Sequence, residues 1–210
     1  MRNIAIFGGT FDPVHIGHLN ISLAIQKHFN FELYYFLPCK TPTIKAPAFA
    51  NTQQRVAMLE LALSPYNQFK VDLREIQRTL PSYMVDTLKS FRVENPDACI
   101  SLIIGYDAFL SLPKWHQWQD ILKLSNLLVI NRPGFKVTPS QEINELLITH
   151  QVNTVKRLKS SKAGVIYLFD AGHYDVSSTT IRGQLQHQLS VDIEVPQTVK
   201  EYIMRWKLYR

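Results

Sequence analysis

The sequence has few of the features that mark secreted, membrane-bound or zinc-binding proteins. Its 210 residues include only two cysteines, Cys39 and Cys99, which stand too far apart to form a metal-binding pair such as C-x-x-C. No apolar run is long enough to span a bilayer, and no signal-peptide pattern is present. Repeats and low-complexity segments are also absent. We therefore expect a protein of the reducing cytoplasm that does not bind membranes.

The charge is unbalanced toward the basic side. The 23 lysines and arginines exceed the 17 acidic residues, which gives a net charge of +6 and a pI of about 9.3. This balance suits anionic ligands, either small phosphate compounds or nucleic acid. The basic stretch at residues 200–210 can account for much of the excess as solvated surface. The length and the 46% share of hydrophobic residues predict a single domain, residues 1–210, with a sizeable core.

The most informative stretch is residues 4–18, I-A-I-F-G-G-T-F-D-P-V-H-I-G-H. Its apolar start predicts a buried strand, and Gly8 and Gly9 then allow a sharp turn and the close approach of a ligand to the backbone. An apolar helical pattern follows, so His15 and His18 stand at the start of a helix. Because a helix start has unpaired N–H groups and a positive dipole end, we expect the two imidazoles to help bind phosphate there.

Strand-like and helix-like segments alternate along the rest of the chain. Further strands are expected at residues 32–37, 69–76, 99–105, 126–130 and 164–169. Further helices are expected at residues 52–63, 81–91, 106–110, 115–124, 138–150, 177–189 and 196–208. This alternation predicts an α/β fold, in which right-handed crossovers build a parallel sheet covered by helices on both faces. Ligands of such sheets bind beyond the carboxyl ends of the strands.

Two polar segments fall at such positions. The run S-S-T-T-I-R at 177–182 opens an expected helix, and its backbone N–H groups, hydroxyls and guanidinium suit a polyphosphate. Asp107 comes directly after the strand at 99–105. It either caps the next helix or accepts hydrogen bonds from ribose hydroxyls.

The string G-G-T-F-D-P-V-H-I-G-H closely resembles the signature of the nucleotidylyltransferases, and its flanking residues resemble the bacterial nicotinate-nucleotide adenylyltransferases. Further motifs follow along the whole chain in the family's pattern. They are P-S-Y-M at 81–84, I-I-G-Y-D at 103–107, P-K-W at 113–115, R-P-G at 132–134 and V-S-S-T-T-I-R at 176–182, in which Val176 replaces the family's isoleucine. The resemblance implies a Rossmann-like parallel sheet of the nucleotidylyltransferase type with a small helical C-terminal part.

The resemblance also implies a reaction and its substrates. In this family ATP and nicotinate mononucleotide give nicotinate adenine dinucleotide and pyrophosphate, in NAD synthesis. The 5′-phosphate of the mononucleotide would attack the α-phosphorus of ATP in line, so positioning and charge stabilisation can supply nearly all of the rate without a covalent intermediate. Mg²⁺ is expected as the cofactor, held largely by the phosphates and water, and we assign no metal ligand to the chain.

Roles for individual residues follow from the matching motifs. The catalytic residues implied are His15, His18 and Arg182, which would stabilise charge on the phosphates. ATP would contact Gly8, Gly9, Thr10, Phe11, His15, His18, Gly105, Asp107, Ser177, Ser178, Thr180 and Arg182. Within this set, Asp107 would hold the adenosine ribose.

The mononucleotide would be bound by a second set of residues. It consists of Lys45, Ser82, Tyr83, Met84, Trp115, His116 and Arg132. The indole of Trp115 would stack on the cationic pyridine ring and gain from cation–π attraction. Two residues depart from the family pattern, because Met84 replaces a threonine and Ile44 replaces a histidine. The preference between nicotinate and nicotinamide mononucleotide therefore stays open.

Three alternatives fit parts of the sequence. Pantetheine-phosphate adenylyltransferases share the histidine motif but fit poorly at Ser82, Tyr83 and Trp115. Class I aminoacyl-tRNA synthetases share H-I-G-H, yet they need a lysine-rich second signature that we do not find here. A nucleic-acid-binding module needs aromatic residues interleaved with a basic stripe. We expect no nucleic acid partner, and the sequence leaves monomer and homo-oligomer open.

Overall fold

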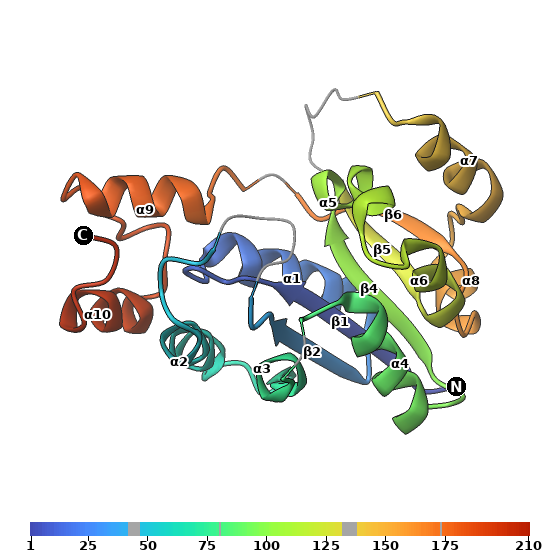
Figure 1. Ribbon diagram of the computed structural model, residues 1–210, viewed down its shortest axis with the longest axis horizontal. Helices are drawn as coiled ribbons and strands as arrows, with labels where there is room; N and C mark the ends of the chain where they lie inside the picture. The colour runs from blue at the N-terminus through green and yellow to red at the C-terminus, as the bar shows by residue number, and fades with distance from the viewer. Residues whose placement is uncertain (42–46, 80, 132–137, 173) are drawn as a thin grey trace.

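The computed structural model describes residues 1–41, 47–79, 81–131, 138–172 and 174–210 (Figure 1). Within these ranges the strands form one six-stranded parallel sheet with the order β3-β2-β1-β4-β5-β6. The strands are β1 (Asn3–Gly9), β2 (Leu33–Pro38), β3 (Phe69–Val71), β4 (Cys99–Gly105), β5 (Asn126–Asn131) and β6 (Ile166–Asp170). The predicted parallel sheet is confirmed. Since the strand order reverses between β1 and β4, the sheet has its topological switch point there.

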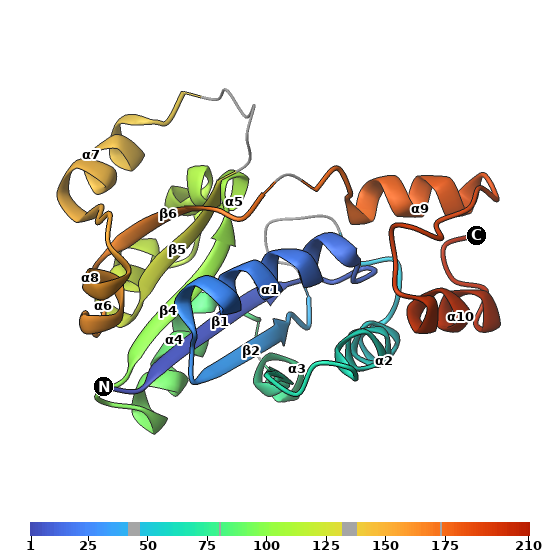
Figure 2. The same ribbon diagram turned by 180° about the vertical axis from the view of Figure 1, so that it is seen from behind.

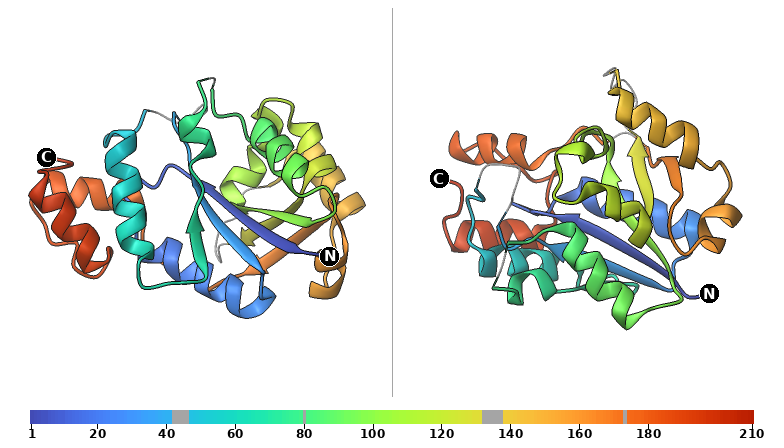
Figure 3. Two further views of the ribbon diagram at one scale, coloured as in Figure 1. Left: turned by 90° about the horizontal axis from the view of Figure 1, so that it is seen from below. Right: turned by 45° about the vertical axis from the view of Figure 1, so that its right-hand side comes forward.

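Helices cover both faces of the sheet, as Figure 3 shows. They are α1 (Ile16–Phe29), α2 (Thr52–Leu63), α3 (Arg74–Gln77), α4 (Met84–Glu94), α5 (Tyr106–Leu110), the 3₁₀ helix η1 (Leu112–Lys114), α6 (Trp118–Leu124), α7 (Gln141–His150), α8 (Val155–Ser160), α9 (Ser178–Gln186) and α10 (Gln197–Arg205). None of the helices in the described ranges is long and apolar enough to cross a membrane.

Alternate residues of β1 enter two separate hydrophobic clusters, as expected for a strand covered on both faces. Ala5 and Phe7 pack with residues of α1, α2, α8, α9 and α10. Ile4 and Ile6 pack instead with residues of α4, α5, α6 and α7. The sheet therefore has one helical layer on each face, and the first strand lies at its centre.

The C-terminal helices form the small helical part that the resemblance implied. Figures 1 and 2 show α9 and α10 side by side at one end of the molecule, with α10 next to α2. Val199 and Ile203 of α10 are buried in the same cluster as Met58 of α2 and Ile181 of α9. This packing connects the C-terminal helices to the first βα units.

One local prediction was wrong, and one helix was missed. The segment expected to be extended at 69–76 is a strand only to Val71, because the Asp72 carboxylate accepts a hydrogen bond from the Arg74 N–H (2.9 Å) and helix α3 begins there. Helix α8 was not predicted at all. It is six residues long and buries only Leu158 among its residues, so it leaves almost no apolar periodicity in the sequence.

Candidate active site

A pocket of about 710 Å³ lies at the carboxyl ends of β1, β2, β4 and β5. This volume is in the range of small-molecule sites. Most of the residues predicted to bind substrates line it. They are Gly8, Gly9, Thr10, Phe11, His15, His18, Ser82, Tyr83, Met84, Gly105, Asp107, Trp115, His116, Ser178 and Arg182. Lys45 and Arg132 lie outside the described residues, as do Ile44 and the R-P-G motif at 132–134.

His15 and His18 lie together at the start of α1, where His15 is the N-cap residue. Their ring centroids are 3.7 Å apart, and the His15 N–H donates to Nδ1 of His18 (3.3 Å). A neutral imidazole that accepts at Nδ1 carries its proton on Nε2, so the Nε2–H of His18 is a donor. The rings of Phe7 and Phe11 pack around His18, with centroids at 5.9 and 5.1 Å. Packing and hydrogen bonding thus fix both the position and the tautomer of this imidazole.

Glycine is required at two places in this segment. A Cβ on Gly9 would lie 2.8 Å from the ring of Phe11, whose own φ is +51°. A Cβ on Gly17 would lie 2.7 Å from Cγ1 of Val176, the residue before the 177–182 run. Gly17 therefore lets the first turn of α1 approach the entry to α9, a role that the sequence analysis did not assign to it.

The start of α9 is hydrogen-bonded to the loop that precedes the histidines. The Ser178 hydroxyl donates to the carbonyl oxygen of Pro13 (2.9 Å), and Nη1 of Arg182 donates to that of Asp12 (2.7 Å). The Arg182 guanidinium also lies over the ring of Phe49, 4.7 Å from its centroid. Two segments that are about 165 residues apart in the chain thereby face one pocket.

Ser177 and Thr180 were predicted to contact ATP but do not line the pocket. Ser177 is the N-cap of α9, and its hydroxyl oxygen accepts from the Thr180 N–H (3.1 Å). The two hydroxyls are also within hydrogen-bond distance of each other (2.8 Å). Thr179, which was not predicted, lines the pocket instead.

Asp12 is a buried acidic residue for which the sequence predicted no role. Its carboxylate accepts from the N–H groups of Phe49 (2.7 Å) and Ala50 (3.1 Å) and from the hydroxyl of Tyr209 (2.7 Å). Burial and the neighbouring Asp12 charge raise the pKa of Tyr209. Through its carboxylate and its carbonyl group, Asp12 connects the histidine loop to the C-terminal segment and to Arg182.

Arg55 of α2 was also missed, although its side chain is only 1% exposed. Its Nη1 donates to the carbonyl oxygen of Thr10 (2.7 Å), and Nη2 donates to those of Cys39 (2.8 Å) and Lys40 (2.9 Å). One guanidinium thus fixes the two segments that leave β1 and β2 at the rim of the pocket. No motif points to it, because its partners are backbone groups distant in sequence.

The side chain of Asp107 does not cap α5, so the capping role that the sequence left open for this residue is excluded. The N-cap residue is Gly105, and no side chain caps this helix. A Cβ on Gly105 would lie 2.7 Å from Oδ1 of Asp107, so the carboxylate folds back toward the end of β4. Asp107 is exposed in the pocket and can accept hydrogen bonds from a ligand.

Aromatic side chains gather at the other part of the pocket. The rings of Tyr83 and His116 stack with centroids 4.3 Å apart and an interplanar angle of 28°. Trp115 is half-buried and follows η1, and Met84 begins α4. A flat, partly apolar ligand group suits these walls better than a phosphate does.

No group of three or more His, Cys, Asp or Glu side chains in the described ranges could hold a metal ion. Around the two histidines and the start of α9, the pocket is lined by imidazole, hydroxyl and guanidinium groups, next to the hydrogen-bonded carboxylate of Asp12. These donors match anionic oxygens.

Comparisons with known proteins agree with this geometry. A model of the cytidylyltransferase-like family matches residues 6–184. A protein of Legionella pneumophila (strain Paris), described as a probable nicotinate-nucleotide adenylyltransferase, is 54% identical over 100% of both chains. A protein of Methylococcus capsulatus with the same description is 39% identical over 98% of this chain and 99% of its own.

A solved structure with the same fold is that of Plasmodium falciparum nicotinic acid mononucleotide adenylyltransferase complexed with NaAD. It superposes with a TM-score of 0.73 at 19% identity, over 100% of this chain and 98% of that one. The similarity of fold therefore extends over the whole sheet and the C-terminal helices.

Proposed function

The chain belongs to the cytidylyltransferase-like family and to the nicotinate-nucleotide adenylyltransferases, and on this premise we propose that its pocket binds ATP and nicotinate mononucleotide. The protein transfers the adenylyl group of ATP to nicotinate mononucleotide and produces nicotinate adenine dinucleotide and pyrophosphate, a step of NAD biosynthesis. We further propose that the reaction takes place in the cytoplasm and that residues 1–210 act as a single domain.

One observation carries the assignment of the phosphate end. The hydrogen bonds from Ser178 to Pro13 and from Arg182 to Asp12 bring the start of α9 to the loop that carries His15 and His18. Donors from both segments therefore face the same pocket. A polyphosphate with several anionic oxygens is the ligand that such a ring of donors fits best.

The chemistry needs no nucleophile from the chain. A phosphate oxygen of the mononucleotide attacks the α-phosphorus of ATP, and the bond to the leaving pyrophosphate breaks in line. The chain's contribution is to position both phosphates and to stabilise the charge that builds on them. The Nε2–H of His18 and the Arg182 guanidinium are donors already fixed by other contacts, so they need little rearrangement in the transition state.

Bound Mg²⁺ would neutralise part of the charge on the triphosphate. The donor set in the pocket fits a metal held by phosphates and water, so we assign it no residue of the chain.

The remaining assignments follow the division of the pocket. Asp107 would accept hydrogen bonds from the adenosine ribose. Trp115 would stack on the pyridine ring, with Ser82, Tyr83, Met84 and His116 around it. Lys45 and Arg132 complete the proposed mononucleotide site on the strength of the family pattern alone.

Pyrophosphate release tests the function. The protein should release pyrophosphate from ATP and Mg²⁺ in the presence of nicotinate mononucleotide, and the dinucleotide product should appear in equal amount. Nicotinamide mononucleotide, assayed in parallel, measures the preference for the acid. Pyrophosphate release that is independent of either mononucleotide, or no release at all, would exclude the proposed function.

A further inference from the structure

Glu75 is a buried carboxyl group in the wall of the pocket for which the reaction described above has no use. Its side chain is part of a residue only 2% exposed, on α3, and it lines the pocket together with Ser82, Tyr83 and Met84. These three residues belong to the proposed mononucleotide site. An ionisable group in that position can interact electrostatically with a ligand bound in this part of the pocket.

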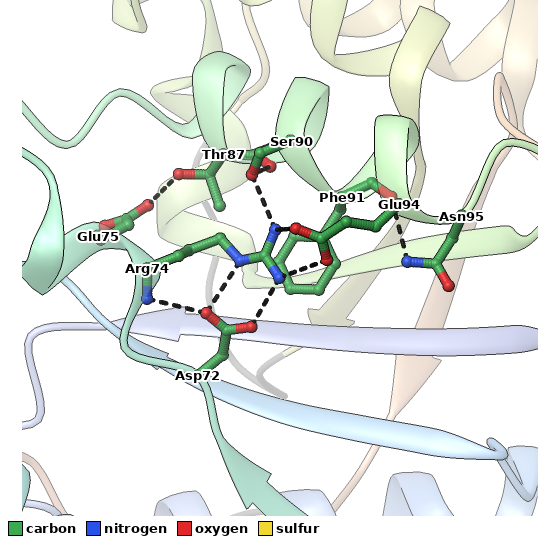
Figure 4. A network of polar contacts seen from close by, with 8 residues as sticks. All are labelled: Asp72, Arg74, Glu75, Thr87, Ser90, Phe91, Glu94 and Asn95. Atoms are coloured by element: carbon green, nitrogen blue, oxygen red, sulfur yellow. Dashed lines mark hydrogen bonds and ion pairs between the residues drawn. The ribbon is translucent and has the colours of Figure 1, made fainter.

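The Glu75 carboxyl group has hydroxyl partners instead of a cation in direct contact. The Thr87 hydroxyl donates to Oε1 of Glu75 (2.7 Å), as Figure 4 shows, and Nη1 of Arg78 donates to the same hydroxyl oxygen (3.3 Å). The Thr87 hydroxyl therefore lies between the guanidinium of Arg78 and the carboxyl group of Glu75. Among the ion pairs of the described residues, none includes Glu75.

The neighbouring arginine is bound elsewhere. Figure 4 shows the guanidinium of Arg74 between Asp72 and Glu94, and these contacts measure 2.8 and 2.9 Å. It also donates to the hydroxyl of Ser90 (2.8 Å) and lies 3.5 Å from the centroid of the Phe91 ring. Two carboxylates already balance this charge, so it does little to stabilise a charge on Glu75.

The surroundings of Glu75 favour its neutral form. Burial raises its pKa to about 7, while Thr87, Arg78 and Ser82 lower the pKa and the charge of Asp72 raises it. Burial raises the pKa of the Cys39 thiol, and the charge of Glu75 adds to this rise. Glu75 thus changes its charge near neutral pH.

We propose that Glu75 is a specificity-determining residue that favours nicotinate over nicotinamide mononucleotide only while its carboxyl group is protonated. The inference rests on the proposed function, since it needs the pyridine end of the mononucleotide to occupy the part of the pocket around Ser82 and Tyr83. Nicotinate carries a carboxylate and nicotinamide a neutral amide, so only the acid is repelled by an ionised Glu75.

The sign and the size of the effect follow from this charge. Below the pKa of Glu75 the wall is neutral and accepts the substrate carboxylate. Above it, two like charges share one pocket, and at an effective dielectric constant of about 20 a separation of about 10 Å weakens binding roughly tenfold. The preference for the acid should therefore fall as the pH rises through about 7.

The experiment measures kcat/KM for both mononucleotides between pH 5.5 and 8.5 and uses their ratio. Both substrates carry the same phosphate, whose second ionisation lies near pH 6. Both substrates also react with the same ATP, in the presence of the same metal ion and the same histidines. These shared ionisations cancel in the ratio, which leaves only groups that distinguish a carboxylate from an amide.

We expect the acid-to-amide ratio of the wild-type protein to fall roughly tenfold over this range, and that of Glu75→Gln to be independent of pH. Glu94→Gln is the matched control, because Glu94 belongs to the same network but pairs with Arg74 and does not line the pocket (Figure 4). This variant should keep the wild-type slope. A wild-type ratio that does not change with pH would overturn the inference.

His116 is another residue whose charge would change the acid-to-amide ratio in the same direction. It lines the pocket and stacks on Tyr83, so a charge on its ring would act on the same substrate carboxylate. If the slope persists in Glu75→Gln and disappears in His116→Asn, Glu75 is not the determinant. Absence of adenylyl transfer to either mononucleotide would instead exclude the proposed function, so the two failures are distinguishable.

Unfolding measurements give a readout that does not depend on activity. The pKa of Glu75 is raised from 4.5 to about 7 in the folded protein, so between these values the folded state binds a proton that the unfolded chain has lost. The free energy of unfolding should therefore fall as the pH rises through this window. Glu75→Gln should gain stability relative to wild type from pH 5 to pH 8, and a constant difference would contradict the proposed protonation.

Discussion

At the scale of single residues, the proposed phosphate site depends on a histidine whose hydrogen-bonding role is fixed before any ligand binds. The His15 N–H donates to Nδ1 of His18, which leaves the proton of a neutral His18 on Nε2. The edge contact of Phe11 and the ring of Phe7 restrict its rotation. A donor held in this way stabilises developing charge without the cost of reorientation.

Replacement of this donor tests its role. His18→Ala should lower kcat by about 10²–10³-fold, the size of the loss when one preorganised donor is removed. His28→Ala is the control, because His28 is an exposed imidazole near the other end of α1 and does not line the pocket. Single-turnover rates and circular dichroism spectra of both variants provide the comparison, and unchanged turnover in His18→Ala would remove His18 from catalysis.

The site residues that were predicted and those that were missed differ in how far along the sequence their contact partners lie. His15 and His18 were found because one short string carries them. Asp12 and Arg55 were missed because Asp12 meets Tyr209 across 197 residues and Arg55 meets Thr10 across 45. A single sequence records neither contact, although a buried carboxylate or guanidinium always needs such partners.

At the scale of elements, the C-terminal segment supports the loop that carries the histidines. Tyr209 is only 7% exposed, and its hydroxyl is one of three donors to the buried Asp12 carboxylate. The carbonyl group of the same residue receives Arg182 from α9. Loss of one donor should therefore lower the stability of the protein and change the position of Arg182, the proposed catalytic arginine.

Tyr209→Phe removes this hydroxyl and keeps the ring. We expect a loss of about 1–3 kcal/mol in the free energy of unfolding, because a buried carboxylate is left one donor short, together with a higher KM for ATP. Tyr202→Phe on α10 is the matched control, since in the described residues its hydroxyl makes no hydrogen bond and its ring packs on Trp206. Urea titrations measure the free energy of unfolding of both variants. Equal losses of stability in the two would show that the hydrogen bond to Asp12 contributes nothing.

Element boundaries were predictable where local signals were complete. Helix α2 spans Thr52–Leu63 as predicted, with Asn51 accepting the Gln54 N–H as its N-cap. Strand β4 and helix α5 also have the predicted bounds, since a run that is apolar except for Ser101 ends at Gly105. The prediction of extended structure at 69–76 was wrong because a three-residue strand and a four-residue helix are each shorter than the window in which periodicity can be recognised.

At the scale of the whole molecule, the fold places the two halves of the site on opposite sides of a switch point. Gly8 and Gly9 end β1, Gly105 ends β4, and the order of the strands reverses between these two neighbours. Alternation of strands and helices predicted the parallel sheet. The strand order was not predictable from periodicity, because it depends on which buried faces pack together.

The central claim is that His15 and His18 bind the same polyphosphate as residues 178–182. A crystal structure with ATP in which a methylene group replaces the α,β-bridging oxygen tests it most directly. We predict phosphate oxygens about 3 Å from Nε2 of His18 and from the Arg182 guanidinium, in one pocket at the ends of β1 and β4. Phosphates bound elsewhere, or bound to one of the two segments while the other lies beyond hydrogen-bond distance, would contradict the account.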